Sequence, residues 1–197
     1  MNDWESLEKE CLICAACELA KTRTNVVFGT GKRDSGVLFI GEGPGEQEDK
    51  TGVPFVGRAG ALLDKFLAAV ELGREQVYIA NIVKCRPPQN RDPLPAEQEA
   101  CIGYLRRQVK LIAPRIIVCL GRIAAMTLIS PDFKVTKQHG SWFLKNDIWM
   151  MGTFHPAALL RNPAQKPDAF EDYLKLRDKA RELGVFPEPA TAVCADN

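Results

Sequence analysis

The sequence has almost no net charge and lacks any long apolar run. Its 26 Lys and Arg nearly balance its 25 Asp and Glu, which leaves a formal net charge of +1. There is no global positive field, so a nucleic-acid partner would have to be held by local clusters of Lys and Arg. No stretch is apolar for the length that a membrane span needs, so we expect no membrane contact.

A secretory signal is also missing from the sequence. The first five residues, MNDWE, are acidic and lack the basic region and apolar core of such a signal. We therefore expect a cytoplasmic protein, nucleoid-associated in a prokaryote. Seven cysteines are many for 197 residues. Without a secretory signal, their odd number argues against a disulfide framework and favours metal binding or buried thiols.

The length and the 46% apolar composition indicate one compact α/β domain, which we expect to be a monomer. Apolar runs predict strands at residues 37–40, 77–83, 115–120 and 148–154, and amphipathic segments predict helices at 58–72, 96–112 and 168–183. Their alternation predicts a three-layer doubly wound sandwich with a central four-stranded parallel sheet. We expect the domain to span residues 1–184 and the Pro- and Ala-rich segment 185–197 to be a flexible tail.

In a doubly wound sheet, ligands bind outside the carboxyl ends of the strands. The unusual residues of this sequence follow its predicted strands: a glycine-rich segment at 41–45, Asn81, Gly121 and His155. The chain has only two histidines, and the other, His139, lies in what we expect to be a surface turn. A lone histidine is more often structural than catalytic, but the position of His155 favours a functional role.

Four cysteines are candidates for one metal centre. Cys14 and Cys17 form a C-x-x-C pair, and Cys85 and Cys101 lie far along the chain. Four thiolates suit either zinc or an iron–sulfur cluster, and the spacing does not separate the two. The pairing is also open, since Cys11 and Cys14 have the same spacing as Cys14 and Cys17.

The remaining cysteines are expected elsewhere. Cys119 lies inside a predicted strand and should belong to the core, and Cys194 lies in the predicted tail and should take no part. A buried thiol is a fair reading of a C-x-x-C pair taken alone. Cys85, however, follows an apolar strand in a proline-rich loop, where a structural thiol is less expected.

The segment after the first predicted strand reads GEGPGEQE. Three glycines within five residues let the backbone turn sharply and approach a ligand. The segment is no phosphate-binding P-loop, because it has no Gly-Lys-Ser/Thr end and carries three carboxylates. Phe55 follows in a second Gly- and Pro-rich segment, where its ring either plugs the core or offers a platform for a flat base.

Together these segments resemble the iron–sulfur uracil-DNA glycosylases, family 4 of the uracil-DNA glycosylase superfamily. The resemblance covers about residues 11–183. It rests on motifs in the right order: the Cys14/Cys17 pair followed by ELAKTRT, GEGPGE at 41–46, GVPFVGRAG at 52–60, NIVKCRPP at 81–88 and HPAALLRNP at 155–163. Several motifs in one order make the resemblance highly specific.

The resemblance implies a uracil-DNA glycosylase fold and a monofunctional enzyme. The implied reaction hydrolyses the N-glycosidic bond of deoxyuridine in single- or double-stranded DNA. It releases uracil and leaves an abasic site, as in base excision repair. The resemblance also implies a [4Fe-4S] cluster with Cys14, Cys17, Cys85 and Cys101 as its ligands.

Roles for individual residues follow from the same resemblance. Phe55 would stack on the uracil after the nucleotide has left the base stack, and Asn81 would bond the uracil edge. Gly41 and Gly43 would add backbone contacts. His155 would donate a hydrogen bond to uracil O2 as negative charge develops there.

The sequence differs from the wider superfamily at the position of the residue that orients the attacking water. Its best-known members carry an Asp in the first motif, and the corresponding position here is Gly43. Glu42 and Glu48 lie nearby, and we take Glu42 as the first candidate.

Contacts to the rest of the DNA are expected from residues after the strands. Arg161, Lys84, Arg86 and also Arg91 should meet phosphates. Leu159 either enters the gap left by the flipped base or packs in the core, and the sequence leaves both possible.

Two other functions are compatible with parts of this pattern. A related branch binds uracil-DNA without catalysis or traps it covalently, but it carries a basic, His-containing insertion near the second motif. No histidine lies between Lys84 and Cys101, so we disfavour that function. An electron-transfer or structural metal protein would leave Phe55, Asn81 and His155 together by coincidence. Release of free uracil from DNA separates these alternatives from a glycosylase.

Overall fold

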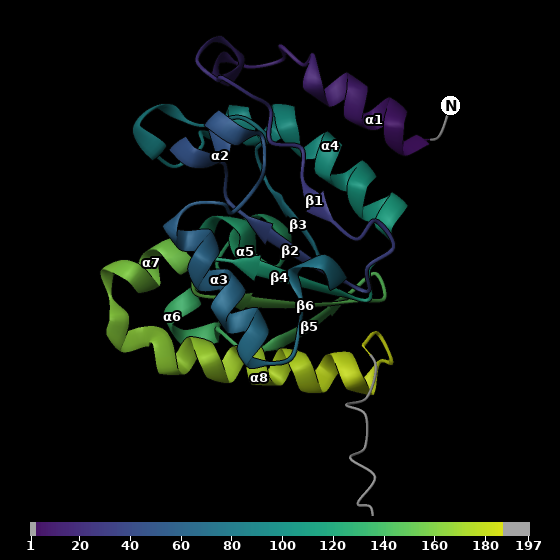
Figure 1. The fold of residues 1–197 in the computed structure, drawn as a ribbon, viewed down its shortest axis with the longest axis vertical. Coiled ribbons are helices and arrows are strands. Elements are labelled where there is room, and N and C mark those ends of the chain that lie inside the picture. The colour runs from purple at the N-terminus through teal and green to yellow at the C-terminus, as the bar shows by residue number, and fades with distance from the viewer. Residues whose placement is uncertain (1–2, 187–197) are drawn as a thin grey trace, which may run out of the picture.

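The computed structural model of the protein describes residues 3–186 (Figure 1). A six-stranded mixed sheet forms its centre, in the order β1-β3-β2-β4-β6-β5. The strands are β1 (Thr30–Gly31), β2 (Val37–Gly41), β3 (Tyr78–Asn81), β4 (Ile116–Leu120), β5 (Trp142–Lys145) and β6 (Ile148–Thr153). The predicted α/β class and single domain are therefore confirmed.

The four central strands are parallel, as the sequence predicts. β2 pairs with β3 on one side and with β4 on the other, and β4 pairs with β6. Every residue of β2, β3 and β4 is buried. Strands covered on both faces read as continuous apolar runs, which is why the sequence reveals these elements.

The sheet has two strands more than the four that the sequence predicts. Both are antiparallel edge strands. β1 pairs with β3 and is only two residues long. β5 pairs with β6 across a tight turn at Asn146 and Asp147, whose φ angles are 50° and 61°. Such left-handed pairs are typical of hairpin turns. β1 has only two residues, and the residues of β5, WFLK, are half-buried or exposed, so no continuous buried run marks either edge strand.

The helices lie on both faces of the sheet, as predicted. They are α1 (Asp3–Leu12), α2 (Glu46–Thr51), α3 (Arg58–Ala69), α4 (Pro95–Ile112), α5 (Arg122–Leu128), α6 (Val135–Gln138), α7 (Pro156–Arg161) and α8 (Lys166–Glu182). Short 3₁₀ turns lie at Glu18–Lys21, Arg74–Gln76, Pro88–Asn90 and Pro163–Gln165.

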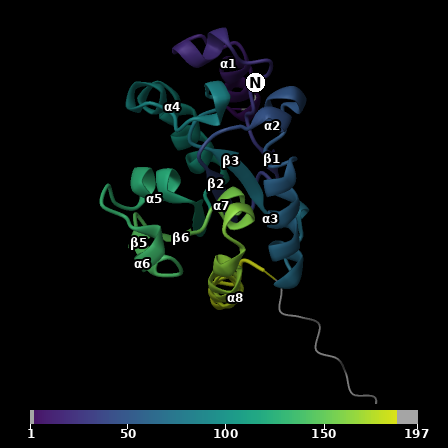
Figure 2. The same cartoon turned by 90° about the vertical axis from the view of Figure 1, so that its left-hand side faces the viewer.

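Alternate strand residues face two separate cores, which makes the three layers. Leu38 and Ile40 of β2 pack into a cluster with α1, α4 and α5. Val37 and Phe39 pack into a second cluster with α3, α7 and α8. Figure 2 shows α4 and α5 on one side of the sheet and α3 on the other. Cys119 of β4 is fully buried, which confirms its place in the core.

The ordered domain extends slightly beyond residue 184. Val185 and Phe186 are half-buried and pack against the α3 and α8 core, and the Val185 N–H donates to the Ala180 carbonyl at 3.0 Å. These two residues therefore belong to the domain and not to a tail, while residues 187–197 lie outside the described part of the chain. No helix within residues 3–186 has the length and apolar character needed to cross a membrane.

The sheet order brings the sequence motifs to one edge. After β2, the chain adds β3 on one side of this strand and then β4 on the other side. The edge beside β2 is therefore a topological switch point of the sheet. Ligands of doubly wound sheets bind at such a point, outside the carboxyl ends of the strands. β2, β3, β4 and β6 end at or just before Glu42, Asn81, Gly121 and His155.

Candidate active site

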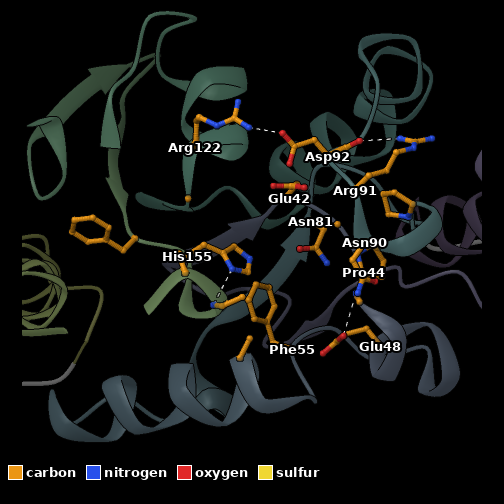
Figure 3. Close-up of a pocket in the computed structure, with 18 of the residues that line it drawn as sticks. Glu42, Pro44, Glu48, Phe55, Asn81, Asn90, Arg91, Asp92, Arg122 and His155 are labelled. Atoms are coloured by element: carbon orange, nitrogen blue, oxygen red, sulfur yellow. Dashed lines mark hydrogen bonds and ion pairs between the residues drawn. The ribbon is translucent and has the colours of Figure 1, made fainter. Parts of the chain in front are cut away.

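A pocket of about 540 Å³ lies at this edge of the sheet (Figure 3). Its walls come from the segment between β2 and α2, the loop before α3, the loop between β3 and α4, and the beginnings of α5 and α7. Phe55, Asn81 and His155 point toward one another in it, with Glu42 close by. The structure thus brings together the residues that the sequence places after separate strands.

Asn81 is the buried polar residue at the centre of the pocket. Its side chain is 1% exposed, and Oδ1 accepts no hydrogen bond within the described part of the chain. Gly41 lies opposite Asn81 in the parallel pairing of β2 and β3. A Cβ at Gly41 would collide with Asn81 Oδ1 and with the Phe55 ring, at 2.7 Å from its Cζ. Glycine is therefore required at position 41 for Asn81 and Phe55 to lie side by side.

Phe55 is held in a conformation that non-glycine residues rarely adopt. Its φ angle is 53°, in the left-handed region, which costs backbone energy in a residue with a bulky side chain. Arg74 holds the loop by donating to the Phe55 carbonyl at 2.8 Å and to the Pro54 carbonyl. The ring is nearly buried, lines the pocket, and its centre lies 5.7 Å from that of the His155 ring.

His155 is the N-cap residue of α7, and its ring Nδ1 accepts the Ala157 N–H at 3.2 Å. That bond leaves the proton of the neutral ring on Nε2. Burial, with a further contribution from Arg161, lowers the pKa of His155 to about 4 against an opposing effect of Glu48. At neutral pH the ring is therefore an uncharged Nε2–H donor. Gly121, with a φ of 88°, leaves room for it, because a Cβ there would lie 2.8 Å from His155 Cβ.

Glu42 has an unusual acidity for a carboxyl group. Burial and the neighbouring Asp92 raise its pKa to about 7, against the opposing charges of Arg122 and Arg161. Arg122 itself forms an ion pair with Asp92. Glu42 is consequently close to half ionised at neutral pH, a state suited to a group that accepts a proton.

Glu48, the second candidate, has a different place. Its Oε1 accepts the N–H groups of Val56 and Gly57 at 2.9 Å each, and its Oε2 accepts that of Gly45 at 3.1 Å. Both oxygens are thus engaged with the backbone, and the side chain ties the glycine-rich segment to the Phe55 loop. The geometry favours Glu42 over Glu48 as the residue that orients a water.

Two expectations about DNA contacts need correction. Lys84 is 1% exposed, and its Nζ donates to Gln108 Oε1 at 2.6 Å inside the protein. It cannot reach a phosphate, because the loop that carries it turns inward at this position. Leu159 is also 1% exposed and belongs to the α3 and α8 core, so of the two possibilities the structure supports core packing.

The arginines near the pocket differ in their availability. Arg161 is exposed and lines the pocket. The Arg86 side chain is 26% exposed and donates to Asn90 Oδ1 at 2.9 Å. Arg91 is bound at both nitrogens by the buried Glu97, at 2.8 and 2.6 Å. Arg161 and Arg86 therefore remain candidates for phosphate contacts, whereas Arg91 serves the structure of its loop.

A second, smaller hollow is lined by five cysteines from four segments: Cys11, Cys14, Cys17, Cys85 and Cys101. The C-x-x-C region follows α1, Cys85 follows β3, and Cys101 lies on α4. Cys85 Sγ accepts from Arg23 at 3.2 Å, and Cys101 Sγ accepts from the Lys84 N–H at 3.2 Å. The predicted ligand set is therefore gathered in one place, with Cys11 beside it.

Some residues around the pocket are not apparent from the sequence. Asn90 and Asp92 line it, and Arg74 holds the Phe55 loop from outside. His139 is more than the surface turn we expect, since it pairs with the buried Asp172. None of these residues stands in a distinctive motif, and only the folded arrangement of the loops reveals their positions.

Comparison with known proteins agrees with this fold and site. A model of the uracil DNA glycosylase superfamily matches residues 28–176. The chain is 41% identical over 184 residues to a type-4 uracil-DNA glycosylase of Archaeoglobus fulgidus, which covers 89% of this chain and 92% of that protein. It is 50% identical over 156 residues to the type-4 enzyme of Thermotoga maritima, a match that covers 76% of this chain and 79% of that protein. It is 42% identical over 200 residues to the type-4 enzyme of Sulfurisphaera tokodaii, a match that covers 97% of this chain and 89% of that protein.

The sheet, the pocket and the family match define a glycosylase of the α/β type. The chain belongs to the uracil DNA glycosylase superfamily and, within it, to the type-4 uracil-DNA glycosylases. The resemblance drawn from the motifs is confirmed.

Proposed function

We propose that this pocket hydrolyses the N-glycosidic bond of deoxyuridine in DNA, releasing uracil and leaving an abasic site for base excision repair. The observation that carries the proposal is the buried Oδ1 of Asn81, which has no partner within residues 3–186. A buried polar atom without a partner costs about 1–3 kcal/mol, so a ligand that supplies a donor is favoured. Uracil supplies that donor at N3–H.

The amide of Asn81 also distinguishes uracil from cytosine. Its Oδ1 accepts from uracil N3–H, and its Nδ2 donates to uracil O4. Cytosine presents an acceptor at N3 and a donor at its amino group, so the same amide would meet the reverse pattern.

The target nucleotide has to leave the base stack before it can enter the pocket. Phe55 supplies an aromatic face in the pocket, and stacking of a base on an aromatic ring is worth about 1–3 kcal/mol. The strained backbone at Phe55 supports a functional role for this ring. Arg161 lines the pocket and Arg86 lies in the loop after β3, and both are candidates to meet phosphates beside the flipped nucleotide.

His155 stabilises the leaving group. As the C1′–N1 bond breaks, its electron pair passes to uracil, and negative charge develops on uracil O2. The neutral Nε2–H of His155 donates a hydrogen bond to that oxygen, and the bond strengthens as the charge grows. A charged imidazole is not required, in agreement with the lowered pKa of His155.

Glu42 orients the water that attacks C1′ from the opposite face of the sugar. The ionised carboxylate accepts one proton of this water as the new C1′–O bond forms, and its negative charge favours the positive charge on the sugar. With its pKa near 7, a large share of Glu42 is ionised at neutral pH. The bonds of Glu48 to three backbone N–H groups support the choice of Glu42.

The five-cysteine hollow fits a [4Fe-4S] cluster, and we assign Cys14, Cys17, Cys85 and Cys101 as its ligands. Within residues 3–186, no three Cys, His, Asp or Glu side chains are gathered closely enough to hold a single ion. A zinc site would need four sulfurs about 2.3 Å from one point. Thiols spread around a hollow suit the larger cluster better, and a cluster here would join α1, α4 and the loop after β3.

The charges around the hollow support an anionic group. Four thiolates and the cluster core together carry negative charge, whereas burial, with the neighbouring Cys85 and Cys17, raises the pKa of Cys101 to about 11 against the opposing effect of Lys84. Lys84 is buried beside Cys101 and pairs with no Asp or Glu among the described residues, and Arg23 donates to Cys85. An isolated buried ammonium is costly, so a neighbouring anion accounts for its position. The positive charge of Lys84 would thus stabilise the anionic cluster and not a DNA phosphate.

Replacing Asn81 by Asp tests the proposed function directly. A carboxylate cannot donate to uracil O4, so we expect single-turnover release of uracil from DNA to fall about 5- to 140-fold, the equivalent of about 1–3 kcal/mol. Asn146→Asp, in the exposed turn between β5 and β6, is the matched control and should release uracil at the normal rate. Unchanged release by the Asn81 variant would remove this residue from the site.

Replacing His155 by Ala should lower the chemical rate about 10²- to 10³-fold, because a donor to a developing anion is lost. Binding to DNA that carries a non-cleavable uracil analogue should change little. His155→Asn retains a good helix cap and separates loss of the cap from loss of the donor. A fall in binding as large as the fall in rate would instead indicate a residue that only positions the substrate.

The ionisation of Glu42 predicts a pH dependence. Because its pKa is raised to about 7, the carboxylate is lost as pH falls through 7. We expect the single-turnover rate to fall about tenfold per unit at pH values below this point and to level off above it. Glu42→Gln should be slow and nearly independent of pH between 6 and 8. A pH profile of the Gln variant equal to that of the original chain would assign the titration to another group.

The cofactor assignment predicts a brown protein with about four irons per chain. Cys85→Ser should lose iron and visible absorption together, because one ligand of the cluster is removed. Cys119→Ala, a buried cysteine in β4 away from the hollow, should keep both. Colourless protein that holds one equivalent of zinc would contradict the assignment.

A further inference from the structure

A buried polar network lies just behind the active site, at the end of β6. Asp172 of α8 is fully buried and accepts the Thr153 hydroxyl at 2.6 Å. It also accepts the His139 Nδ1–H, at 3.0 Å from each carboxylate oxygen. We call these three residues, His139, Thr153 and Asp172, the strand-end network. Thr153 is the last residue of β6 and lies two positions before His155.

The same elements hold the neighbouring residues of the strand. The His139 ring packs against Phe154, with 4.7 Å between ring centres, and Phe154 lines the pocket. The Gly140 N–H donates to the Gly152 carbonyl at 3.0 Å. On the other side, the Thr153 carbonyl accepts the Gly121 N–H at 2.8 Å. Residues 152, 153 and 154 are therefore each held immediately before the catalytic histidine.

Stability alone does not account for such a network. Taking a carboxylate out of water is costly, and a buried ion pair often stabilises a fold less than apolar side chains of the same size would. Asp172 lies among apolar residues of the second core, next to Ala169, Tyr173 and Leu176 on the same helix. Buried polar groups instead define one geometry, because every partner has to be in place at once.

We propose that His139, Thr153 and Asp172 are positioning residues that set the orientation of the His155 ring toward the substrate. The proposal rests on the role of His155 given above. None of the three touches the substrate. They act by fixing where β6 ends and how the chain enters α7. In the described structure, the only hydrogen bond to the His155 side chain is that from the Ala157 N–H on α7. A displacement of about 1 Å at a reacting group can cost about 10²-fold in rate.

The two histidines of the chain make the experiment simple. Imidazole signals of holoenzyme in NMR come from His139 and His155 alone, and His139→Gln assigns them. Thr153→Val has nearly the same shape as threonine but removes the donor to Asp172. We expect the His155 signals to shift or broaden in this variant. We also expect single-turnover uracil release to fall about 10- to 100-fold while binding to the non-cleavable analogue stays within about twofold.

Thr153→Ser restores the hydroxyl and should restore both the signals and most of the rate. Thr127→Val removes a threonine hydroxyl bond on α5, from Thr127 to the Ile123 carbonyl at 2.7 Å, and should change neither. If Thr153→Val does not fold, Asp172→Asn keeps the shape of the network and removes its charge. It should give the same shift and the same loss of rate.

Unchanged His155 signals and an unchanged rate in folded Thr153→Val would overturn the proposal. Equal losses of rate and binding, with a lower melting temperature and unshifted His155 signals, would also overturn it and indicate a structural role. The NMR measurement does not depend on turnover. A failure of the proposed glycosylase role, seen as no uracil release by the unaltered chain, is therefore distinguishable from a failure of the positioning role.

Discussion

The close packing of Asn81 and Phe55 against Gly41 is the constraint on which the site depends. Gly41 and Asn81 lie opposite each other on adjacent parallel strands, and only the lack of a side chain at Gly41 leaves room for both neighbours. At this contact, Asn81 Oδ1 has no partner within residues 3–186 and Phe55 has a strained backbone. The fold tolerates these two local costs because Arg74 and Glu48 hold the surrounding loops by bonds to their backbone atoms. The pairing of two strands thus fixes the position of the amide proposed to recognise the base.

Electrostatics divides the pocket into two regions that fit the two sides of the scissile bond. His155 is uncharged at neutral pH and presents an N–H donor to the pocket. Burial and Asp92 raise the pKa of Glu42 to about 7. In the proposed reaction its carboxylate holds the water and takes its proton. Both shifts have the same physical origin, since a pocket that excludes water disfavours the charged form of either group. The proposed reaction needs the neutral form of the histidine and the ionised form of the glutamate.

The cysteine hollow and the active site share one loop. Cys85 lies in the segment between β3 and α4, and Pro87, Asn90 and Asp92 of the same segment line the pocket. A cluster bound to Cys85 and to Cys101 on α4 would fasten this segment at both ends, because α4 begins at Pro95. Gln89 and Asn90 adopt left-handed backbone angles, which a loop keeps only when its surroundings hold it. A cluster in this hollow would therefore hold one wall of the pocket without taking part in the proposed reaction.

Much of this protein was determined by the sequence alone. The four buried strands appear as continuous apolar runs, and the motifs after them identify the family and the residues of the pocket, because each of these signals is local along the chain. Tertiary structure decided the rest. The edge strands are too short or too exposed to leave a pattern. Lys84 and Leu159 follow strands like surface residues, yet they are buried by helices that approach from elsewhere in the chain. The pairing of His139 with Asp172, the pinning of Glu48 and the raised pKa of Glu42 depend on contacts between distant segments. Burial and charge are properties of the folded surroundings, so no local pattern can report them.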